Sequence, residues 1–320
     1  MKLIVQIPCL NEEKTLPLTV TDIPRKIEGI DQVEILVIDD GSTDRTSDVA
    51  RELGTDHVVR FEKNQGLAKA FMAGIDICLK LGADIIVNTD GDNQYKGEDI
   101  PKLIKPILEG NADMVIGDRE TDKIEHFSLV KKKLQKFGSW VVRKVSGADI
   151  PDATSSFRAM TREAALKLNI LSDFSYTLEA IIQAAKKKIA IKVVPIRTNE
   201  KLREPRLYSN TFVFLKKSAS TIIRTYATYE SLKVFSGIGL VLFLGGVALG
   251  IRFLYFYFSG EGTGHVQSVI FASMLMIMGF LLGMIGLLAD LISANRKLLE
   301  DMLYRIRDLE ISSHTEEPPK

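Results

Sequence analysis

The sequence predicts an α/β protein, with helices on both faces of a mostly parallel β-sheet and a membrane-associated region after it. Two observations lead to this fold class. Short apolar runs alternate with stretches of helical periodicity through residues 1–200. Two long apolar stretches, at 234–258 and 266–292, then replace that alternation.

The expected strands and helices of the soluble part follow one another in a regular order. A first helix is expected from about Glu12, with Asn11 as its N-cap. Helical periodicity is clearest in 67–79, where apolar residues recur at intervals of four and so share one face. The other expected elements are strands at 3–7, 33–38, 57–61, 84–87 and 113–116, and helices at 46–53 and 100–108.

The charge distribution argues against a nucleic-acid-binding protein. The formal net charge is +1, and basic residues cluster locally, with six in 131–144 and eight in 186–206. Such clusters indicate local binding of anions rather than a surface for a long polyanion. Cys9 and Cys78 offer neither a disulfide framework nor the spacing of a zinc site, which is typical of a reducing compartment. The apolar run after Met1 has only the length of a strand, so no signal peptide is expected.

The two apolar stretches are long enough to form a transmembrane hairpin. As helices they could cross the roughly 30 Å hydrocarbon core, and a buried hairpin in a soluble core is the alternative. Arg252 lies near the far end of the first stretch and can reach the interface. The connecting loop, 259–265, contains no Lys or Arg, so the positive-inside rule places both chain ends in the cytosol. The basic residues that flank the outer ends are Lys216, Lys217, Arg224, Lys233, Arg296 and Lys297.

The segments beside the two spans carry amphipathic patterns. Residues 212–229 predict either a helix in the membrane interface or a helix packed on the soluble domain. An apolar stripe after the second span indicates either an oligomerisation helix or a solvated tail with one apolar face. The stripe consists of Leu291, Leu298, Met302, Ile306 and Leu309. Residues 312–320 are polar and are expected to be disordered. The expected boundaries are a catalytic domain at 1–208, an interfacial helix at 209–232, the hairpin at 233–292 and the C-terminal helix and tail at 293–320.

Two acidic motifs stand where predicted strands end. Asp39-Asp40-Gly41-Ser42 follows one strand, and Asp90-Gly91-Asp92 follows another. Ligands of such sheets bind beyond the carboxyl ends of the strands, so the candidate site is formed by the loops at 8–13, 39–46, 63–66 and 90–95. Carboxylates held one residue apart repel each other unless a cation lies between them. A divalent cation there would also neutralise the charge that builds on a nucleoside diphosphate as it leaves an activated sugar.

With these motifs in this order, the chain resembles glycosyltransferase family 2. The matching residues are Pro8-Cys9-Leu10-Asn11-Glu12, Asp39-Asp40-Gly41-Ser42, Asn64-x-Gly66 and Asp90-Gly91-Asp92-Asn93-Gln94. The likeness continues through Gly117-Asp118-Arg119, 152–158 and 195–207. Together with the two spans, the pattern is most similar to polyprenyl-phosphate glycosyltransferases, such as dolichyl-phosphate mannose and glucose synthases and bacterial undecaprenyl-phosphate glucosyltransferases. The resemblance implies a GT-A-type nucleotide-sugar-binding domain, followed by an interfacial amphipathic helix and a two-helix transmembrane hairpin.

The resemblance implies a nucleoside pocket built from the first two loops. Pro8, Leu10 and Glu12 would line it, with Glu12 on the ribose. The family often has Tyr where Leu10 stands, and Glu12 could instead be an acid favoured by the first turn of a helix. Asp40 would accept a hydrogen bond from the ring N–H of the base, and Asp39 would support the loop.

The resemblance also implies how the diphosphate is held. Asp90, Asp92 and Gln94 would hold the metal, Mg²⁺ or Mn²⁺, and the diphosphate. A basic cluster in the 195–207 segment would close over the diphosphate or bind anionic lipid at the membrane surface. The cluster consists of Lys201, Arg203 and Arg206.

The acceptor side is implied by the later motifs. Arg119 would bind the lipid phosphate. Asp152 corresponds to a residue assigned as general base, although a phosphate monoester is already largely ionised at neutral pH. Asp152 could therefore orient the acceptor or balance the basic residues instead. The further candidates for the acceptor phosphate are Lys131, Lys132, Lys133 and Ser155.

The function predicted from the sequence is inverting, metal-dependent transfer of a hexose from a nucleotide-sugar to a polyprenyl phosphate, with UDP favoured over GDP. The alternatives are transfer to another membrane lipid and a catalytically inert, membrane-anchored scaffold of the same fold. A processive polysaccharide synthase is disfavoured, because the single tryptophan, Trp140, is not part of a Gln-x-x-Arg-Trp signature. The resemblance also suggests a homo-oligomer, with a tetramer as one possibility, and no nucleic-acid partner.

Overall fold

The computed structural model describes residues 1–120, 143, 147, 149–170, 176–200, 220, 224, 230–260 and 266–316, and the side chains of these residues up to 311. The chain forms two compact units. One consists of Met1–Ile222 and Leu303–Lys320, and the other of Ile223–Met302. Most of the expected interfacial helix at 209–232 lies outside the described residues.

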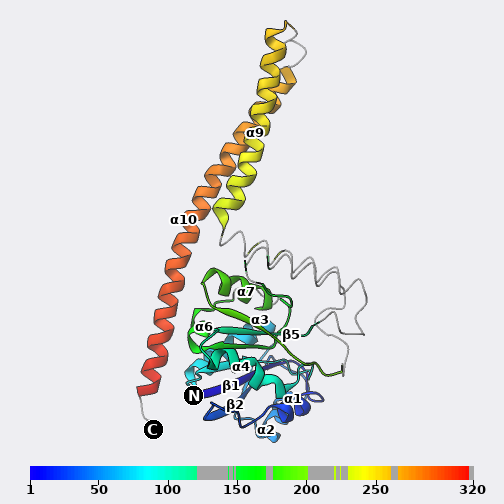
Figure 1. The fold of residues 1–320 in the computed structure, drawn as a ribbon, viewed down its shortest axis with the longest axis vertical. Coiled ribbons are helices and arrows are strands. Elements are labelled where there is room, and N and C mark those ends of the chain that lie inside the picture. The colour runs from blue at the N-terminus through cyan, green and yellow to red at the C-terminus, as the bar shows by residue number, and fades with distance from the viewer. Residues whose placement is uncertain are drawn as a thin grey trace. The chain divides into compact units, whose positions relative to one another are not determined.

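A seven-stranded sheet forms the centre of the first unit (Figure 1). The strand order is β3-β2-β1-β4-β6-β5-β7, and only β6 runs antiparallel to its neighbours. The predicted α/β class with a mostly parallel sheet is therefore confirmed. The strands are β1 (Lys2–Cys9), β2 (Gln32–Asp39), β3 (His57–Arg60), β4 (Ile85–Asn88), β5 (Met114–Asp118), β6 (Arg158–Thr161) and β7 (Ile191–Pro195).

Helices cover both faces of the sheet because alternate residues of its strands point to opposite sides. In β1, Leu3 and Val5 belong to one apolar core, whereas Ile4 belongs to the other. The first core is covered by α1 (Leu16–Asp22), α2 (Thr46–Glu52) and α4 (Ile100–Leu108). The second core is covered by α3 (Leu67–Lys80), α6 (Arg162–Lys167) and α7 (Tyr176–Lys186).

The first helix begins later than the sequence predicts. It starts at Leu16 rather than near Glu12, and a turn precedes it in which the carbonyl of Glu12 accepts the N–H groups of Thr15 and Leu16. Asn11 is not its N-cap, because Asn11 has a φ of 56° and turns the chain in the left-handed region. This turn keeps residues 10–13 available as a loop beyond the end of β1.

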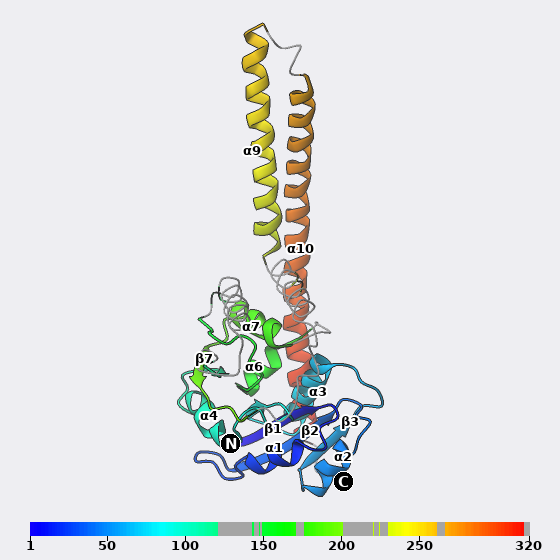
Figure 2. The same ribbon diagram turned by 90° about the vertical axis from the view of Figure 1, so that its right-hand side faces the viewer.

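Two long apolar helices make up most of the second unit. α9 (Ser231–Phe258) and the first part of α10 (Val266–Glu316) are long and apolar enough to cross a membrane. They lie side by side in both views (Figures 1 and 2), and their backbones approach closely. A Cβ atom added at Gly239 would lie 2.6 Å from the carbonyl oxygen of Gly279, so glycine is required there.

The end of α10 belongs to the first unit and packs on the second apolar core. Ile311 is only 5% exposed within that core, and Tyr304 packs against it. Arg307 pairs with Asp76 of α3 at 3.2 Å. The predicted apolar stripe lies on another face, because its five residues, Leu291, Leu298, Met302, Ile306 and Leu309, are all exposed. The expected disordered tail is wrong for 312–316, which continue α10, because extending an existing helix costs little.

Candidate active site

Three loops of the candidate site meet at one edge of the sheet. The strands β2, β1 and β4 are neighbours and run parallel, so their carboxyl ends lie together. The loops that follow them are the ones that the sequence analysis singled out.

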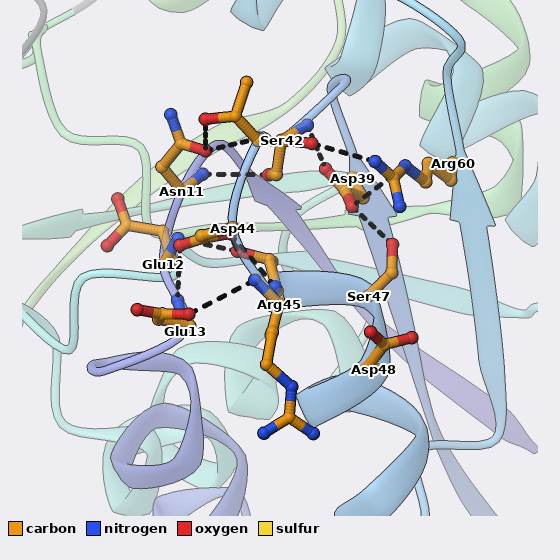
Figure 3. A network of polar contacts seen from close by, with 12 residues as sticks. Asn11, Glu12, Glu13, Asp39, Ser42, Asp44, Arg45, Ser47, Asp48 and Arg60 are labelled. Carbon is orange, nitrogen blue, oxygen red and sulfur yellow. Dashed lines mark hydrogen bonds and ion pairs between the residues drawn. The ribbon is translucent and has the colours of Figure 1, made fainter.

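The loops after β1 and β2 are fastened to each other (Figure 3). The N–H of Asn11 donates to Oγ of Ser42 at 2.8 Å, and the N–H of Thr43 donates to Oδ1 of Asn11 at 2.7 Å. The N–H of Glu12 donates to Oγ1 of Thr46 at 2.8 Å. These reciprocal hydrogen bonds make the two loops one rigid rim.

The carboxylate of Asp39 is bonded within this rim. The residue is fully buried, and its carboxylate accepts hydrogen bonds from the N–H of Ser42 at 2.8 Å and from the hydroxyl of Ser47. Arg60 lies 3.8 Å from it (Figure 3). The supporting role expected for Asp39 stays a prediction.

Asp40 connects the rim to the loop after β3. Its carboxylate accepts the N–H groups of Gln65 at 2.7 Å and Gly66 at 2.9 Å. Burial raises the pKa of Asp40, and the two N–H groups oppose that rise. Gly41 permits the close approach, because it has a φ of 73° and a Cβ atom there would lie 2.6 Å from the nitrogen of Asn64. The predicted bond from Asp40 to a base remains a prediction.

Glu12 connects the rim to the loop after β4. Its carboxylate accepts the hydroxyl of Thr15 at 2.6 Å, and the residue is only 6% exposed. A Cβ atom added at Gly91 would lie 2.7 Å from Sγ of Cys9 and 3.3 Å from Cγ of Glu12. The absence of a side chain at Gly91 thus lets the acidic loop lie directly against the end of β1.

The acidic pair itself lies at the end of β4. The carboxylate of Asp90 accepts the hydroxyl of Ser156, and Asp92 accepts the N–H of Gln94 at 3.2 Å. Desolvation, together with the charge of Asp92, raises the pKa of Asp90 to about 7. Asp92 thus disfavours the ionised form of Asp90, and a cation between the two carboxylates would relieve that repulsion, so the pair fits a divalent metal.

The protein supplies few ligands for such a cation. Among the residues with described side chains, no group of three or more His, Cys, Asp or Glu could hold a metal ion. A cation on Asp90 and Asp92 would therefore take its other ligands from water or from a bound anion. Mg²⁺ is usually held in this way, by one or two carboxylates together with substrate phosphates.

Tyr95 and Ser156 complete the surroundings of Asp90, and neither has a role predicted from the sequence. The hydroxyl of Tyr95 lies 3.1 Å from the nitrogen of Ser156, whose N–H it accepts, and 3.0 Å from Oγ of Ser156. The ring of Tyr95 stacks on Phe157 with centroids 5.2 Å apart. A tyrosine in an otherwise polar loop was the available signal, because a buried tyrosine hydroxyl usually has a partner.

The acceptor-side motifs meet at the same edge. Arg119, just after β5, donates to both carboxylate oxygens of Asp152 at 2.7 and 3.0 Å and to Oγ1 of Thr154 at 2.8 Å. The guanidinium of Arg119 also lies 6.0 Å from the ring centroid of Tyr95. Burial opposes ionisation of Asp152, but Arg119 outweighs burial and lowers the pKa of that carboxyl.

Arg158, another residue with no predicted role, forms hydrogen bonds to the loop that carries Asp152. Arg158 is fully buried and donates to the carbonyls of Ser155 at 2.8 Å and Ala153 at 3.2 Å. Ser155 is also buried, and its Oγ has no hydrogen-bond partner in the described part of the chain. Its predicted role at the acceptor phosphate is not tested by this geometry.

The remaining predicted site residues divide into two groups. Pro8 is buried in β1, beside Ile38 of β2, and Leu10 is half-buried in the loop that follows. The basic candidates lie outside the described residues and remain predictions. They are Lys131, Lys132, Lys133, Lys201, Arg203 and Arg206.

Comparison with known proteins decides the family. Residues 4–168, about half of the chain, match the sequence profile of glycosyl transferase family 2. The chain belongs to glycosyl transferase family 2. As a member of this family it is a glycosyltransferase, as the acidic motifs suggested.

Relatives of this glycosyltransferase are known in archaea. The glycosyltransferase AglJ of Haloferax volcanii is 28% identical over 95% of this chain and 96% of its own length. The UDP-N-acetylglucosamine–dolichyl-phosphate N-acetylglucosaminyltransferase of Methanococcus voltae is 29% identical over 60% of this chain and 83% of its own. A solved structure confirms the GT-A fold. It is that of glucosyl-3-phosphoglycerate synthase of Mycobacterium tuberculosis with Mn²⁺, UDP-glucose and phosphoglyceric acid. The two structures align with a TM-score of 0.55 and 22% sequence identity, over 71% of this chain and 78% of the synthase chain.

Proposed function

We propose that this glycosyltransferase transfers a hexose from a nucleotide-sugar to a polyprenyl phosphate with inversion at the anomeric carbon. The observation that carries the proposal is the meeting of an acidic pair and an arginine–aspartate pair at one edge of the sheet. Asp90 and Asp92 suit a cation with a diphosphate, and Arg119 suits a second anion nearby. The two apolar helices suit an acceptor that resides in a membrane.

On the donor side, UDP is favoured over GDP. A relative named for UDP-N-acetylglucosamine and a fold neighbour with bound UDP-glucose support this choice. Glu12 at the ribose, Asp40 at the base, and Pro8 and Leu10 along the pocket are the proposed contacts. The rigid rim made by the loops after β1 and β2 would hold the nucleoside without reorganisation, which favours binding.

Asp90 and Asp92 would hold Mg²⁺ or Mn²⁺, with Gln94 beside the diphosphate. A divalent cation bound there would neutralise the charge that develops on the leaving diphosphate. The acid pair is suited to this task because, when no cation is present, burial and the charge of Asp92 disfavour the ionised form of Asp90. Lys201, Arg203 and Arg206 are proposed to contact the same diphosphate or anionic lipid.

On the acceptor side, Arg119 would bind the lipid phosphate, assisted by Lys131, Lys132 and Lys133. Asp152 is proposed to position Arg119 rather than to act as a general base. The bidentate pair lowers the pKa of Asp152, and a weak base is not suited to proton abstraction near neutral pH. An ionised phosphate oxygen attacks without losing a proton, so the reaction needs orientation of two anions above all.

The membrane topology proposed from the basic flanks keeps the catalytic domain and both chain ends in the cytosol. The proposed boundaries are a catalytic domain at 1–208, an interfacial helix at 209–232, a hairpin at 233–292 and a C-terminal segment at 293–320. A homo-oligomer is also proposed, by resemblance alone. The alternatives are transfer to another membrane lipid and an inert scaffold.

A panel of radiolabelled nucleotide-sugars tests the function directly. Each is incubated with the full-length protein, Mn²⁺ and polyprenyl phosphate, and lipid-extractable label is counted. One sugar should give an acid-labile lipid product that disappears in Asp92→Ala and with a chelator. Transfer that requires a neutral lipid would favour the other-lipid alternative, and no transfer from any donor would favour the scaffold.

A further inference from the structure

Asn199 contacts the acidic loop from a distant part of the chain. It lies four residues after the end of β7, and none of the roles above uses it. Its N–H donates to the carbonyl of Gln94 at 2.9 Å. Its side-chain amide donates to the carbonyl of Asn93 at 3.1 Å and to Oδ1 of Asn93 at 3.3 Å. Three hydrogen bonds therefore join one residue to the two positions that follow Asp92.

The two side-chain bonds hold Asn93, the residue at which the acidic loop turns. Asn93 has a φ of 55°, a left-handed conformation that few residues adopt without support. The turn at Asn93 reverses the chain between Asp92 and Gln94, and the N–H of Gln94 then returns to the carboxylate of Asp92 at 3.2 Å. The side-chain amide of Asn199 holds the backbone carbonyl and Oδ1 of Asn93 in that conformation.

The two residues before Asn199 are bonded to the chain that follows the acidic loop. Thr198 forms an antiparallel bridge with Tyr95, and Arg197 donates from its backbone and its guanidinium to Asp99, at distances of 2.7 to 3.0 Å. Residues 197–199 thus run antiparallel to the chain that leaves the acidic loop. Arg197 fixes the far end of this short ladder, whereas Asn199 fixes the end beside Asp92.

We propose that Asn199 is a positioning residue for the cation and diphosphate. By holding Asn93, Asn199 fixes the turn that brings Asp92 and Gln94 together. The carboxylate of Asp92 is then already in position when the cation binds. Preorganised ligands bind with less loss of entropy, which gives tighter metal binding. This inference rests on the proposed function, because it assumes that Asp92 binds a metal.

Mn²⁺ binding in the presence of UDP tests the proposal without measuring activity. Free Mn²⁺ is followed by its electron paramagnetic resonance signal as the full-length protein with UDP is titrated. Asn199→Ala removes both side-chain bonds but keeps the backbone bond. Since each hydrogen bond contributes modestly, the dissociation constant of Mn²⁺ should rise about tenfold. Asn199→Ser provides a second variant of similar polarity that cannot reach Asn93 in the same way.

Arg197→Gln is the matched control, because it lies on the same ladder but bonds to Asp99. It should lower the thermal stability and leave Mn²⁺ binding unchanged. The proposal is overturned if Asn199→Ala and Asn199→Ser bind Mn²⁺ as the unchanged protein does, or if Arg197→Gln weakens binding equally. If the unchanged protein does not bind Mn²⁺ with UDP at all, the proposed metal site is wrong and the role of Asn199 falls with it.

Discussion

Arg119 and Asp152 form a bidentate ion pair across the acceptor side of the site, with distances of 2.7 and 3.0 Å between the nitrogen and oxygen atoms. Their side chains are only 13% and 1% exposed. Arg119 comes just after β5, and Asp152 comes shortly before β6. The ion pair therefore joins the end of β5 to the chain that leads into β6. Such planar pairs give orientation as well as charge.

Asp152→Asn separates a positioning role from a general-base role. The asparagine keeps the size of the side chain but loses the charge that holds Arg119. If Asp152 positions Arg119, kcat/KM for the acceptor should fall about 10- to 100-fold, because a hydrogen bond to a charged group contributes about 1.5–3 kcal/mol. Binding of UDP should be unchanged. A fall in kcat of a thousandfold or more at saturating acceptor, with an unchanged KM, would instead favour a general base.

Arg119→Gln should change how stability depends on pH. In the unchanged protein, Arg119 lowers the pKa of Asp152. The ion pair therefore stabilises the fold fully above about pH 4, the ordinary pKa of Asp. This stabilisation is lost as the pH falls through the lowered pKa. Without Arg119, burial raises that pKa, and the ionised carboxylate destabilises the fold at neutral pH. The loss in unfolding free energy should reach about 3–5 kcal/mol at pH 7 and shrink as the pH falls.

Arg162→Gln is the control for this pH series. The guanidinium of Arg162 donates to the carbonyl of Leu79 at 3.4 Å, and its backbone N–H, which the glutamine keeps, donates to the carbonyl of Asp84 at 2.9 Å. Its effect on unfolding free energy should be small and independent of pH. A loss in Arg119→Gln that stays constant from pH 7 to pH 4 would contradict the ionised state of buried Asp152.

Much of the fold, and the meeting of the acidic loops at one end of the sheet, could be predicted from the sequence because the signals are local. Apolar runs mark β1, β2 and β4, and the acids that end these strands must lie together once the strands are parallel neighbours. β6 has only four residues, and one of them is the fully buried Arg158, so no strand pattern identified it.

The supporting residues could not be predicted for a different reason. Asn199 lies 106 residues from Asn93 in the sequence, and nothing near either residue indicates that they meet. Ser156 reaches Asp90 over 66 residues in the same way. Periodicity and motifs identify the strands and the acidic loops that follow them, whereas these contacts appear only when the sheet order is known.

Tyr95→Phe should destabilise the protein without disturbing ring packing. The phenylalanine keeps the stack on Phe157 but removes the oxygen that accepts the N–H of Ser156. A buried N–H left without a partner costs about 1–3 kcal/mol, which should appear as a lower unfolding free energy. Tyr255→Phe, at a tyrosine that is 69% exposed, should leave stability unchanged. Equal stabilities of the two variants would show that the bond to Ser156 contributes nothing.

The end of α10 offers a test of whether the C-terminal segment is part of the catalytic unit. Ile311 is 5% exposed in the same core as α3, whereas Leu309, two residues before it, is 70% exposed. Ile311→Ala should therefore lower the unfolding free energy by about 2–4 kcal/mol, since a buried side chain leaves a cavity. Leu309→Ala should change it by less than about 0.5 kcal/mol, as exposed positions do.

Both Ile311→Ala and Leu309→Ala remove apolar atoms from the same helix and introduce the best helix former, so neither can lose stability through helix propensity. Their difference therefore reports packing on the core rather than helix formation. Arg307→Ala should add a further loss, because its guanidinium bonds to the carbonyl of Leu168 at 2.9 Å as well as to Asp76. If chemical unfolding gives the same midpoint for Ile311→Ala and Leu309→Ala, the end of α10 does not pack on α3 in solution. The apolar stripe would then be the better candidate for the face of α10 that contacts another helix.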